Sequence, residues 1–169
     1  MRARTLLRIF SLATAVLIMI AIFYMSAQSG EESSSLSGSL TGSVLDKTED
    51  GFSELDDAEK SEIIESVGKY VRKAAHFAEY FVLCGALTVF AFTFDIKRIP
   101  ACGFSIALAT VYAASDEIHQ LFVPGRCGLF TDVLIDTAGA IFGAVFVLLI
   151  CAVFKIPVKR KQKQSEKIA

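Results

Sequence analysis

The chain has 169 residues, of which 53% are hydrophobic and 21% are charged, and its formal net charge at pH 7 is -1. This apolar fraction is higher than that of a typical soluble domain and points to a membrane protein. The short basic tail comes without a recognition motif, so a nucleic-acid-binding function has no support.

Four windows of the sequence are long and apolar enough to cross a bilayer, which takes about 20 residues. They are Leu6–Met25, Ala74–Phe94, Ile99 to about Ser115, and Val133–Phe154. The third window is short, and its outer end could continue to Phe122. The sequence therefore predicts an all-α fold, an integral membrane bundle of four transmembrane helices.

The first window could be a cleaved signal peptide or an uncleaved anchor. Its apolar region is long for a signal peptide, and "FYMSAQSG" at its end has no clear small-x-small cleavage site. These features favour the uncleaved anchor, which is the first transmembrane helix of the predicted bundle.

A long extramembrane segment, residues 26–71, follows the first window. Its first part, "SGEESSSLSGSLTGS", is rich in Ser and Gly and is typical of a flexible or surface-lying segment. Leu36, Leu40 and Val44 recur at four-residue spacing there, so a short amphipathic helix is an alternative.

The second part of this segment has a clearer helical pattern. Ser53 with Asp56 resembles a helix N-terminal cap. Ile63, Val67 and Val71 then recur every four residues. We expect an external amphipathic helix that continues directly into the second span.

The distribution of Lys and Arg predicts the orientation in the membrane, because cytoplasmic ends of spans carry more of them. Eleven of the 17 basic residues fall on one side of the predicted bundle: Arg2, Arg4, Arg8, Lys97, Arg98, Lys155, Lys159, Arg160, Lys161, Lys163 and Lys167. We therefore expect a multi-pass protein of the cell membrane with both termini cytoplasmic.

This topology divides the chain into four parts. Residues 1–25 form the cytoplasmic N-terminus and the first span, and residues 26–71 form the extracytoplasmic segment. Residues 72–154 carry the other three spans, and residues 155–169 form a basic tail that should be disordered and contact anionic lipid heads.

Polar side chains from the last three spans should meet near the outer leaflet. Ionisable groups are costly in lipid, so they are expected to face the bundle interior and to pair with each other. The sequence therefore predicts an outward-facing polar pocket that binds a ligand. Its predicted lining is Arg72, His76, Glu79, Tyr80, Asp116, Glu117, Gln120, Arg126, Asp132 and Asp136.

Several of these positions also have a purely structural interpretation. His76 could be a buried histidine whose hydrogen bonds are satisfied. Arg72 and its neighbour Lys73 could be interfacial anchors. Asp132 could cap the fourth helix, whose first N–H groups need acceptors. Glu117 could face solvent or the membrane interface together with His119.

Three motifs taken together resemble the VanZ-like family, which is named for a protein associated with teicoplanin resistance. They are "RKAAHFAEY", "DEIHQLFVPGR" and "DVLIDTAGAIFG", in this order. The resemblance covers about residues 9–150 and implies an integral membrane protein of about four helices, without an established reaction. One departure is Asp136, where the family pattern usually has Asn.

These features leave three classes of function open, and a purely structural role is the remaining option. The first is a VanZ-type cell-envelope protein that affects teicoplanin susceptibility, with Arg72 and Arg126 holding the phosphate or carboxylate of a glycopeptide or lipid-linked ligand. The second is an intramembrane hydrolase or transferase that uses His76 with acidic partners. The third is a small transporter or proton relay.

Further details of these hypotheses concern residue roles and partners. In the enzyme, Glu79 or Asp116 would orient His76, or a divalent metal would bind the set His76, Glu79, Asp116 and Asp132. The sequence identifies no cofactor. Expected partners are membrane lipids and a second copy of the chain, which could pair through Gly139 and Gly143 in a GxxxG pattern.

Overall fold

The structure is a computed structural model that describes residues 2–49 and 51–155. These residues form five α-helices and one 3-10 turn, and they contain no strand: α1 (Arg2–Ser26), α2 (Gly30–Thr48), η1 (Phe52–Glu54), α3 (Asp57–Phe92), α4 (Arg98–Gln120) and α5 (Phe130–Val153). The predicted all-α fold is confirmed. Most of the basic tail lies outside the described residues.

Four of the helices are long and apolar enough to cross a membrane: α1, α3, α4 and α5. They correspond in order to the four predicted windows. The third helix ends at Gln120, between Ser115 and Phe122, the two ends that the sequence allowed. A turn follows directly after Gln120 and ends the helix there. The predicted number of spans is therefore confirmed.

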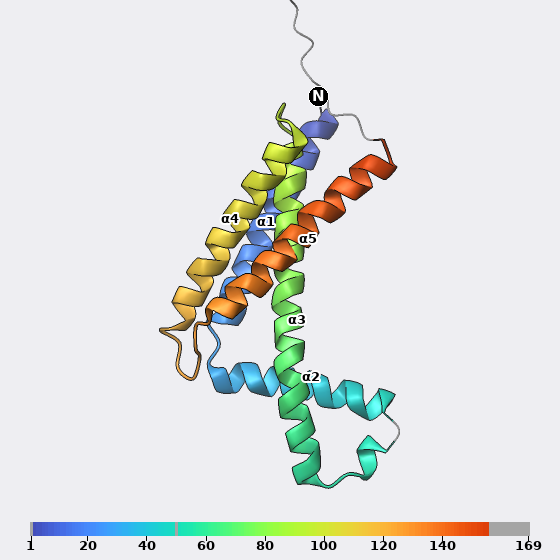
Figure 1. The fold of residues 1–169 in the computed structure, drawn as a ribbon, viewed down its shortest axis with the longest axis vertical. Coiled ribbons are helices and arrows are strands. Elements are labelled where there is room, and N and C mark those ends of the chain that lie inside the picture. Colours follow the sequence, from blue (N-terminus) through green and yellow to red (C-terminus); the bar gives the residue numbers. More distant parts are fainter. Residues whose placement is uncertain (1, 50, 156–169) are drawn as a thin grey trace, which may run out of the picture.

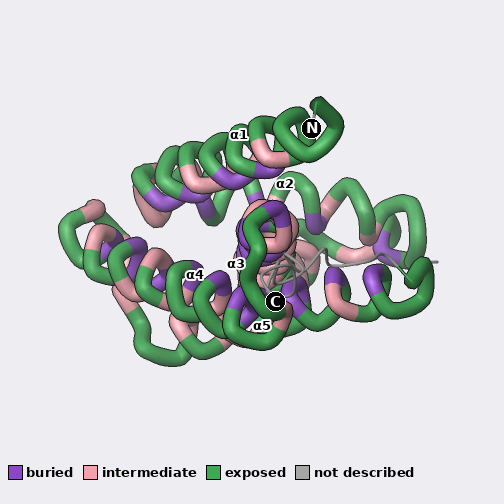
Figure 2. Tube along the Cα trace, turned by 90° about the horizontal axis from the view of Figure 1, so that it is seen from above, coloured by how far each residue is buried: buried purple, intermediate pink, exposed green. Residues whose placement is uncertain are grey.

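Helix α3 is the axis of the bundle. It packs most extensively against α5 and then against α1, while α4 packs against both α5 and α3 (Figure 1). Buried positions face the centre around α3, and the outer faces of the long helices are exposed (Figure 2). In a membrane protein such exposed apolar faces are the surface that contacts lipid.

Small residues let the helices approach closely. Gly139 and Gly143 of α5 are buried against α3, where a Cβ atom would collide with the carbonyl oxygens of Phe77 and Phe81. This is the close contact that small residues four apart permit between membrane helices. Because α3 of the same chain occupies both glycines, they are not a free surface for a second copy.

The predicted external helix does run into the second span, since α3 is continuous from Asp57 to Phe92. The predicted cap at Ser53 is wrong. Asp56 is the N-cap and accepts a hydrogen bond from the N–H of Glu59, whose side chain accepts from the N–H of Asp56. Ser53 lies instead in η1, which follows the turn at Gly51.

The Ser- and Gly-rich segment forms a regular helix, α2. Ser29 caps it in a capping box with Glu32, and the hydrogen bonds from Ser29 hold the pKa of Glu32 below its usual value. The segment is therefore a surface helix that contains Leu36, Leu40 and Val44. Of the two alternatives from the sequence, the helix indicated by their four-residue spacing is confirmed.

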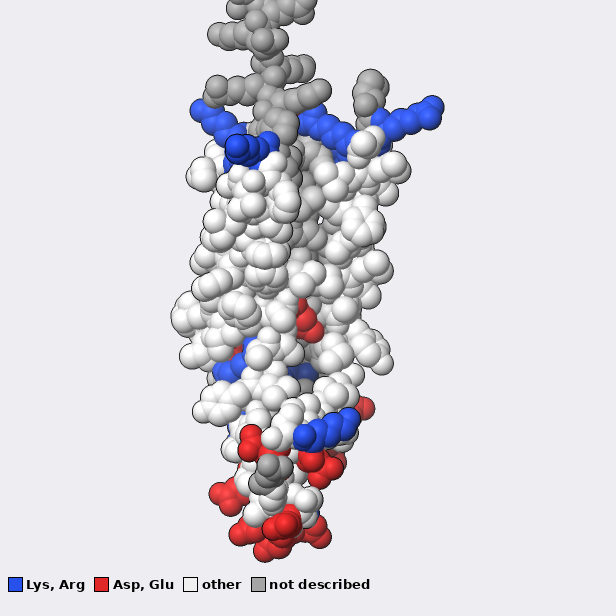
Figure 3. Space-filling model, turned by 90° about the vertical axis from the view of Figure 1, so that its right-hand side faces the viewer, with Lys and Arg blue, Asp and Glu red and all other residues white. Residues whose placement is uncertain are grey.

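Charge separates the two ends of the molecule (Figure 3). Lys and Arg gather where α1 and α4 begin, where Arg4 contacts Asp95 at 3.0 Å and Arg8 donates to the carbonyl oxygen of Thr93. We call this the basic end. Asp and Glu gather at the other end, around α2 and the start of α3, which we call the acidic end.

Adding one methyl group at the contact between α3 and α5 should destabilise the fold. Gly139→Ala places a Cβ against the backbone of Phe77, so the helices must separate, which costs about 1–3 kcal/mol. The midpoint of thermal unfolding in detergent micelles measures this loss. Gly103→Ala is the matched control, because a Cβ there meets nothing within 4 Å. Equal midpoints for the two variants would contradict this packing.

Candidate functional site

Asp116 is the centre of a buried hydrogen-bond network near the acidic end of the spans. Its side chain is 3% exposed. One oxygen, Oδ2, accepts hydrogen bonds from Ser26 Oγ at 2.7 Å and from Gln120 Nε2 at 3.0 Å. Ser26 is the last residue of α1 and Gln120 the last of α4, so this network joins the C-terminal ends of the two helices.

Glu117 extends the network to α5. Its Oε1 accepts from Gln120 Nε2 at 3.2 Å, and its Oε2 accepts from the N–H of Leu129, the N-cap residue of α5, at 2.8 Å. Glu117 is 6% exposed, so the solvent-facing alternative is wrong for it. It supplies one of the acceptors that the start of a helix requires.

The structural alternative for Asp132, a side-chain cap of α5, is wrong. The N-cap residue is Leu129, whose side chain makes no capping hydrogen bond. Asp132 lies within the first turn of α5, and its Oδ1 accepts a hydrogen bond from Lys73 Nζ in an ion pair of 2.6 Å. Lys73 is therefore a partner of Asp132 across α3 and α5 rather than a simple interfacial anchor. His119, the other residue expected at the interface, is partly buried and stacks on Phe23 with ring centroids 4.8 Å apart.

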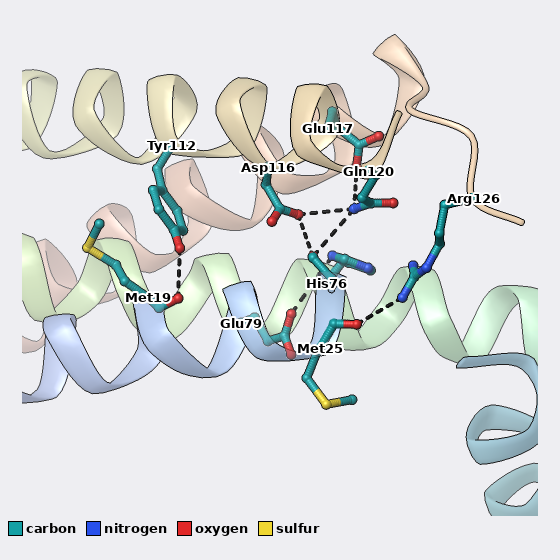
Figure 4. Close-up of polar contacts among 10 residues, drawn as sticks. Met19, Met25, His76, Glu79, Tyr112, Asp116, Glu117, Gln120 and Arg126 are labelled. Carbon is teal, nitrogen blue, oxygen red and sulfur yellow. Dashed lines mark hydrogen bonds and ion pairs between the residues drawn. The ribbon is translucent and has the colours of Figure 1, made fainter. Parts of the chain in front are cut away.

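Two residues of α3 complete the group. His76 Nδ1 lies 3.8 Å from Glu79 Oε2, longer than a hydrogen bond, and both side chains are partly buried. Asp116 and Gln120 point from α4 toward this pair (Figure 4). We call the Asp116 network and this neighbouring pair together the polar cluster: Ser26, His76, Glu79, Asp116, Glu117 and Gln120.

Arg126 lies beside the polar cluster, in the loop between α4 and α5. Its Nη2 and Nε donate to the carbonyl oxygens of Met25 and Gln28, at 2.9 and 3.1 Å, and so satisfy acceptors at the end of α1. Burial lowers the pKa of Arg126, the nearby Arg72 guanidinium acts in the same direction, and Asp116 opposes both. An Arg side chain stays charged under such shifts.

Arg72 lies on α3 and has few partners of its own. Its Nη2 donates to Ser34 Oγ at 3.3 Å, and its buried Nε makes no hydrogen bond. Within residues 2–49 and 51–155, neither Arg72 nor Arg126 has a carboxylate oxygen within 4 Å. Both guanidinium groups therefore lack an ion-pair partner in the described residues, and the charge of Arg72 acts on Arg126.

Tyr80 and Asp136 lie deeper and outside this network. Both residues are fully buried, and neither the Tyr80 hydroxyl nor the two Asp136 oxygens make a hydrogen bond to the described part of the chain. All ten predicted site residues are thus in the half of the bundle nearer the acidic end or in its loop. Their opening into an outward-facing pocket stays a prediction.

The sequence interpretation missed two side chains and several backbone groups. Ser26 had a signal, because it is the first polar residue after the apolar run of the first window. Lys73 was noticed only as an anchor. The carbonyl groups of Met25 and Gln28 and the N–H of Leu129 carry no sequence signal, since every residue type provides them.

No group of three or more His, Cys, Asp or Glu side chains in the described residues is arranged to hold a metal ion. The set His76, Glu79, Asp116 and Asp132 is thus not brought together as a metal site in this structure. Asp132 pairs with Lys73 instead, and Asp116 is held by Ser26 and Gln120.

Comparison with protein families gives one match that covers most of the chain. Residues 11–152 match the family described as VanZ/LLP1. No match was found among curated proteins or among solved structures. The matched range contains all of the polar cluster, Arg72 and Arg126.

Removing the hydroxyl of Ser26 should destabilise the protein. Ser26→Ala leaves the buried Asp116 without one of its two donors, and a buried acceptor that loses its donor costs about 1–3 kcal/mol. Thermal unfolding in detergent measures the effect.

Ser11→Ala is the matched control for this experiment. Ser11 is also buried on α1, but its hydroxyl donates only to carbonyl oxygens of its own helix, so its loss should change stability little. If Ser26→Ala and Ser11→Ala unfold at the same temperature, the hydrogen bond to Asp116 does not stabilise the bundle.

Proposed function

The chain belongs to the VanZ/LLP1 family of membrane proteins, and from this premise we propose that it binds an anionic envelope ligand at the acidic end of its bundle. The ligand carries a phosphate or a carboxylate and is either lipid-linked or of the glycopeptide type. By binding it, the protein changes the susceptibility of the cell to teicoplanin.

The observation that carries this proposal is that Arg72 and Arg126, whose charges act on the same part of the site, both lack a carboxylate oxygen within 4 Å in the described residues. Two like charges held together in a partly buried place repel each other. A phosphate or carboxylate between them would remove this repulsion, and the planar guanidinium fork matches the oxygens of either group. The buried Nε of Arg72 is a donor that such a ligand would use.

The polar cluster offers further contacts beside the two arginines. Asp116 Oδ1 is buried and accepts no hydrogen bond, and His76 Nδ1 is also without a hydrogen-bond partner in the described residues. An acceptor and a titratable nitrogen next to an anion site suit a ligand that carries hydroxyl or amide groups near its charge, as envelope glycolipids and glycopeptides do.

The location of the ligand follows from the orientation that we propose. The basic end faces the cytoplasm by the rule for Lys and Arg, so both termini are cytoplasmic and the acidic end lies outside the cell membrane. Lipid-linked envelope precursors and glycopeptides meet the membrane on that outer side. The charge separation between the two ends supports this arrangement.

Loss of either arginine should abolish most of the effect on teicoplanin. Expressed in a sensitive host, Arg72→Ala and Arg126→Ala should shift the inhibitory concentration toward that of cells without the protein. A charge-assisted contact of about 1.5–3 kcal/mol corresponds to a loss of roughly tenfold or more in affinity. Immunoblots would establish equal amounts of each variant in the membrane.

Lys69→Ala is the control variant. It also removes one positive charge from α3 at the acidic end, but Lys69 is exposed and pairs with Glu65. It should behave like the unmodified protein. If both arginine variants, at equal expression, change teicoplanin susceptibility as much as the unmodified protein does, the two guanidinium groups do not bind the ligand.

A reaction at the same site is the second candidate function, a hydrolase or transferase that uses His76. The observation in its favour is the neighbouring carboxylate, since Glu79 could draw closer and orient the imidazole when substrate binds. His76→Gln separates the two candidates. In the binding account it should leave most of the teicoplanin effect, whereas a reaction that uses His76 as base should be lost while the protein still binds ligand.

A further inference from the structure

Helix α2 crosses the bundle axis where the spans end (Figure 1). It begins directly after α1, and it packs against α3 through small residues, with Ser37 and Thr41 close to Gly68. A neighbouring stripe of α2 is apolar, and about half of its surface is exposed. Leu36, Leu40 and Val44 are 42%, 56% and 58% exposed.

The contacts of α2 show which way this stripe points. Gly38 and Gly42 lie against Ile64, which is one turn before Gly68 on the part of α3 that extends away from the spans. Successive residues of an α-helix are about 100° apart, so residues two apart lie on nearly opposite sides. Leu36 and Leu40 each precede one of these glycines by two residues, and therefore they face the spans.

The level of α2 along the bundle matches the surface of a bilayer. From Gly68, where α2 crosses α3, to Phe92 at the basic end there are 24 residue steps of one continuous helix, or about 36 Å. The hydrocarbon core of a bilayer is about 30 Å thick, and the headgroups extend the total to about 40–45 Å. Helix α2 thus lies at headgroup level, with its leucines directed at the hydrocarbon boundary.

Aromatic side chains mark the same level on the spans. Tyr24, Phe122 and Phe130 lie at the ends of α1, α4 and α5 that face α2, and they are 68%, 80% and 75% exposed. Exposed aromatic rings gather where membrane helices meet the headgroups. The apolar stripe of α2 therefore lies at the same height along the bundle as the aromatic rim of the surface that contacts lipid.

We propose that α2 is an interfacial helix whose stripe of Leu36, Leu40 and Val44 inserts into the bilayer surface. Lipid is the occupant of this face, as in other amphipathic helices that lie in the plane of a membrane. Two of the three acidic residues of α2 suit this arrangement, because Glu31 and Asp46 are exposed and lie on the side of the helix away from Leu40.

This membrane contact also reaches the loop that carries Arg126. The N–H of Gly30, the first residue of α2, donates to the carbonyl oxygen of Pro124 at 3.0 Å. A Cβ at Gly30 would collide with the carbonyl oxygen of Gly125, so the two segments are in direct backbone contact. Lipid that holds α2 in place thereby holds this loop. The inference does not depend on the identity or the existence of the anionic ligand.

Spin labelling in proteoliposomes tests the proposal. A nitroxide at Leu40→Cys is compared with one at Ser35→Cys, both in a Cys127→Ser background, because Cys127 is the exposed native cysteine. Ser35 is exposed on the same helix and lies about 140° around it from Leu40. The ratio of collisions with oxygen, which dissolves in lipid, to collisions with a polar nickel complex reports the depth of each label.

The proposal predicts a ratio several times higher at Leu40 than at Ser35. Equal ratios at the two positions would overturn it. Spin–spin broadening at Leu40 that disappears on dilution with unlabelled protein would also overturn it, because a second copy would then cover the stripe. Size-exclusion chromatography of both variants, with the unlabelled Cys127→Ser protein as reference, ensures that folded protein is compared.

Discussion

A carboxylate enclosed by apolar helices needs hydrogen-bond donors from the protein itself, because lipid offers none. Asp116 meets this requirement with the hydroxyl of Ser26 and the amide of Gln120, and the same amide reaches Glu117. Glu117 in turn accepts from the backbone where α5 begins. One chain of hydrogen bonds thus ties together the C-terminal ends of α1 and α4 and the N-terminal end of α5, and the rest of the site is arranged around it.

The close packing of α3 makes this arrangement possible. Gly139 and Gly143 bring the backbone of α5 against α3, and the core contains small residues such as Ala109, Ala113 and Ala144. Helices that approach this closely hold polar side chains in a narrow interior rather than exposing them to lipid. The exposed loop after α4 is fixed separately, by the carbonyl groups that Arg126 binds and by α2.

The architecture could be predicted from the sequence because its signals are long and repetitive. Hydropathy indicated four spans, and the four-residue spacing from Ile63 to Val71 indicated a helix that runs into the second of them. Alternation of the spans across the bilayer then placed residues distant in sequence, such as His76 and Asp116, at the same end. Convergence of the site followed from topology and did not require side-chain geometry.

The individual partners could not be predicted in the same way. The hydrogen bonds of Glu117 and Arg126 go to backbone groups, which have no sequence signal. The choice between a cap and an ion pair for Asp132 depends on where Lys73 reaches across from α3. The true cap of α3 was three residues later than expected, because Ser53 was taken up by a 3-10 turn whose formation depends on local geometry at Gly51.

Proximity between the C-terminal ends of α1 and α4 is the central claim, and cross-linking in native membranes measures it most directly. Cysteines at positions 26 and 120, introduced as Ser26→Cys and Gln120→Cys with Cys127→Ser, are treated with a short bis-thiol-reactive reagent. The account predicts a cross-link within one chain, because Ser26 Oγ lies 3.5 Å from Gln120 Nε2. Cross-links only between chains, or none when each single variant reacts with a thiol reagent, would contradict it.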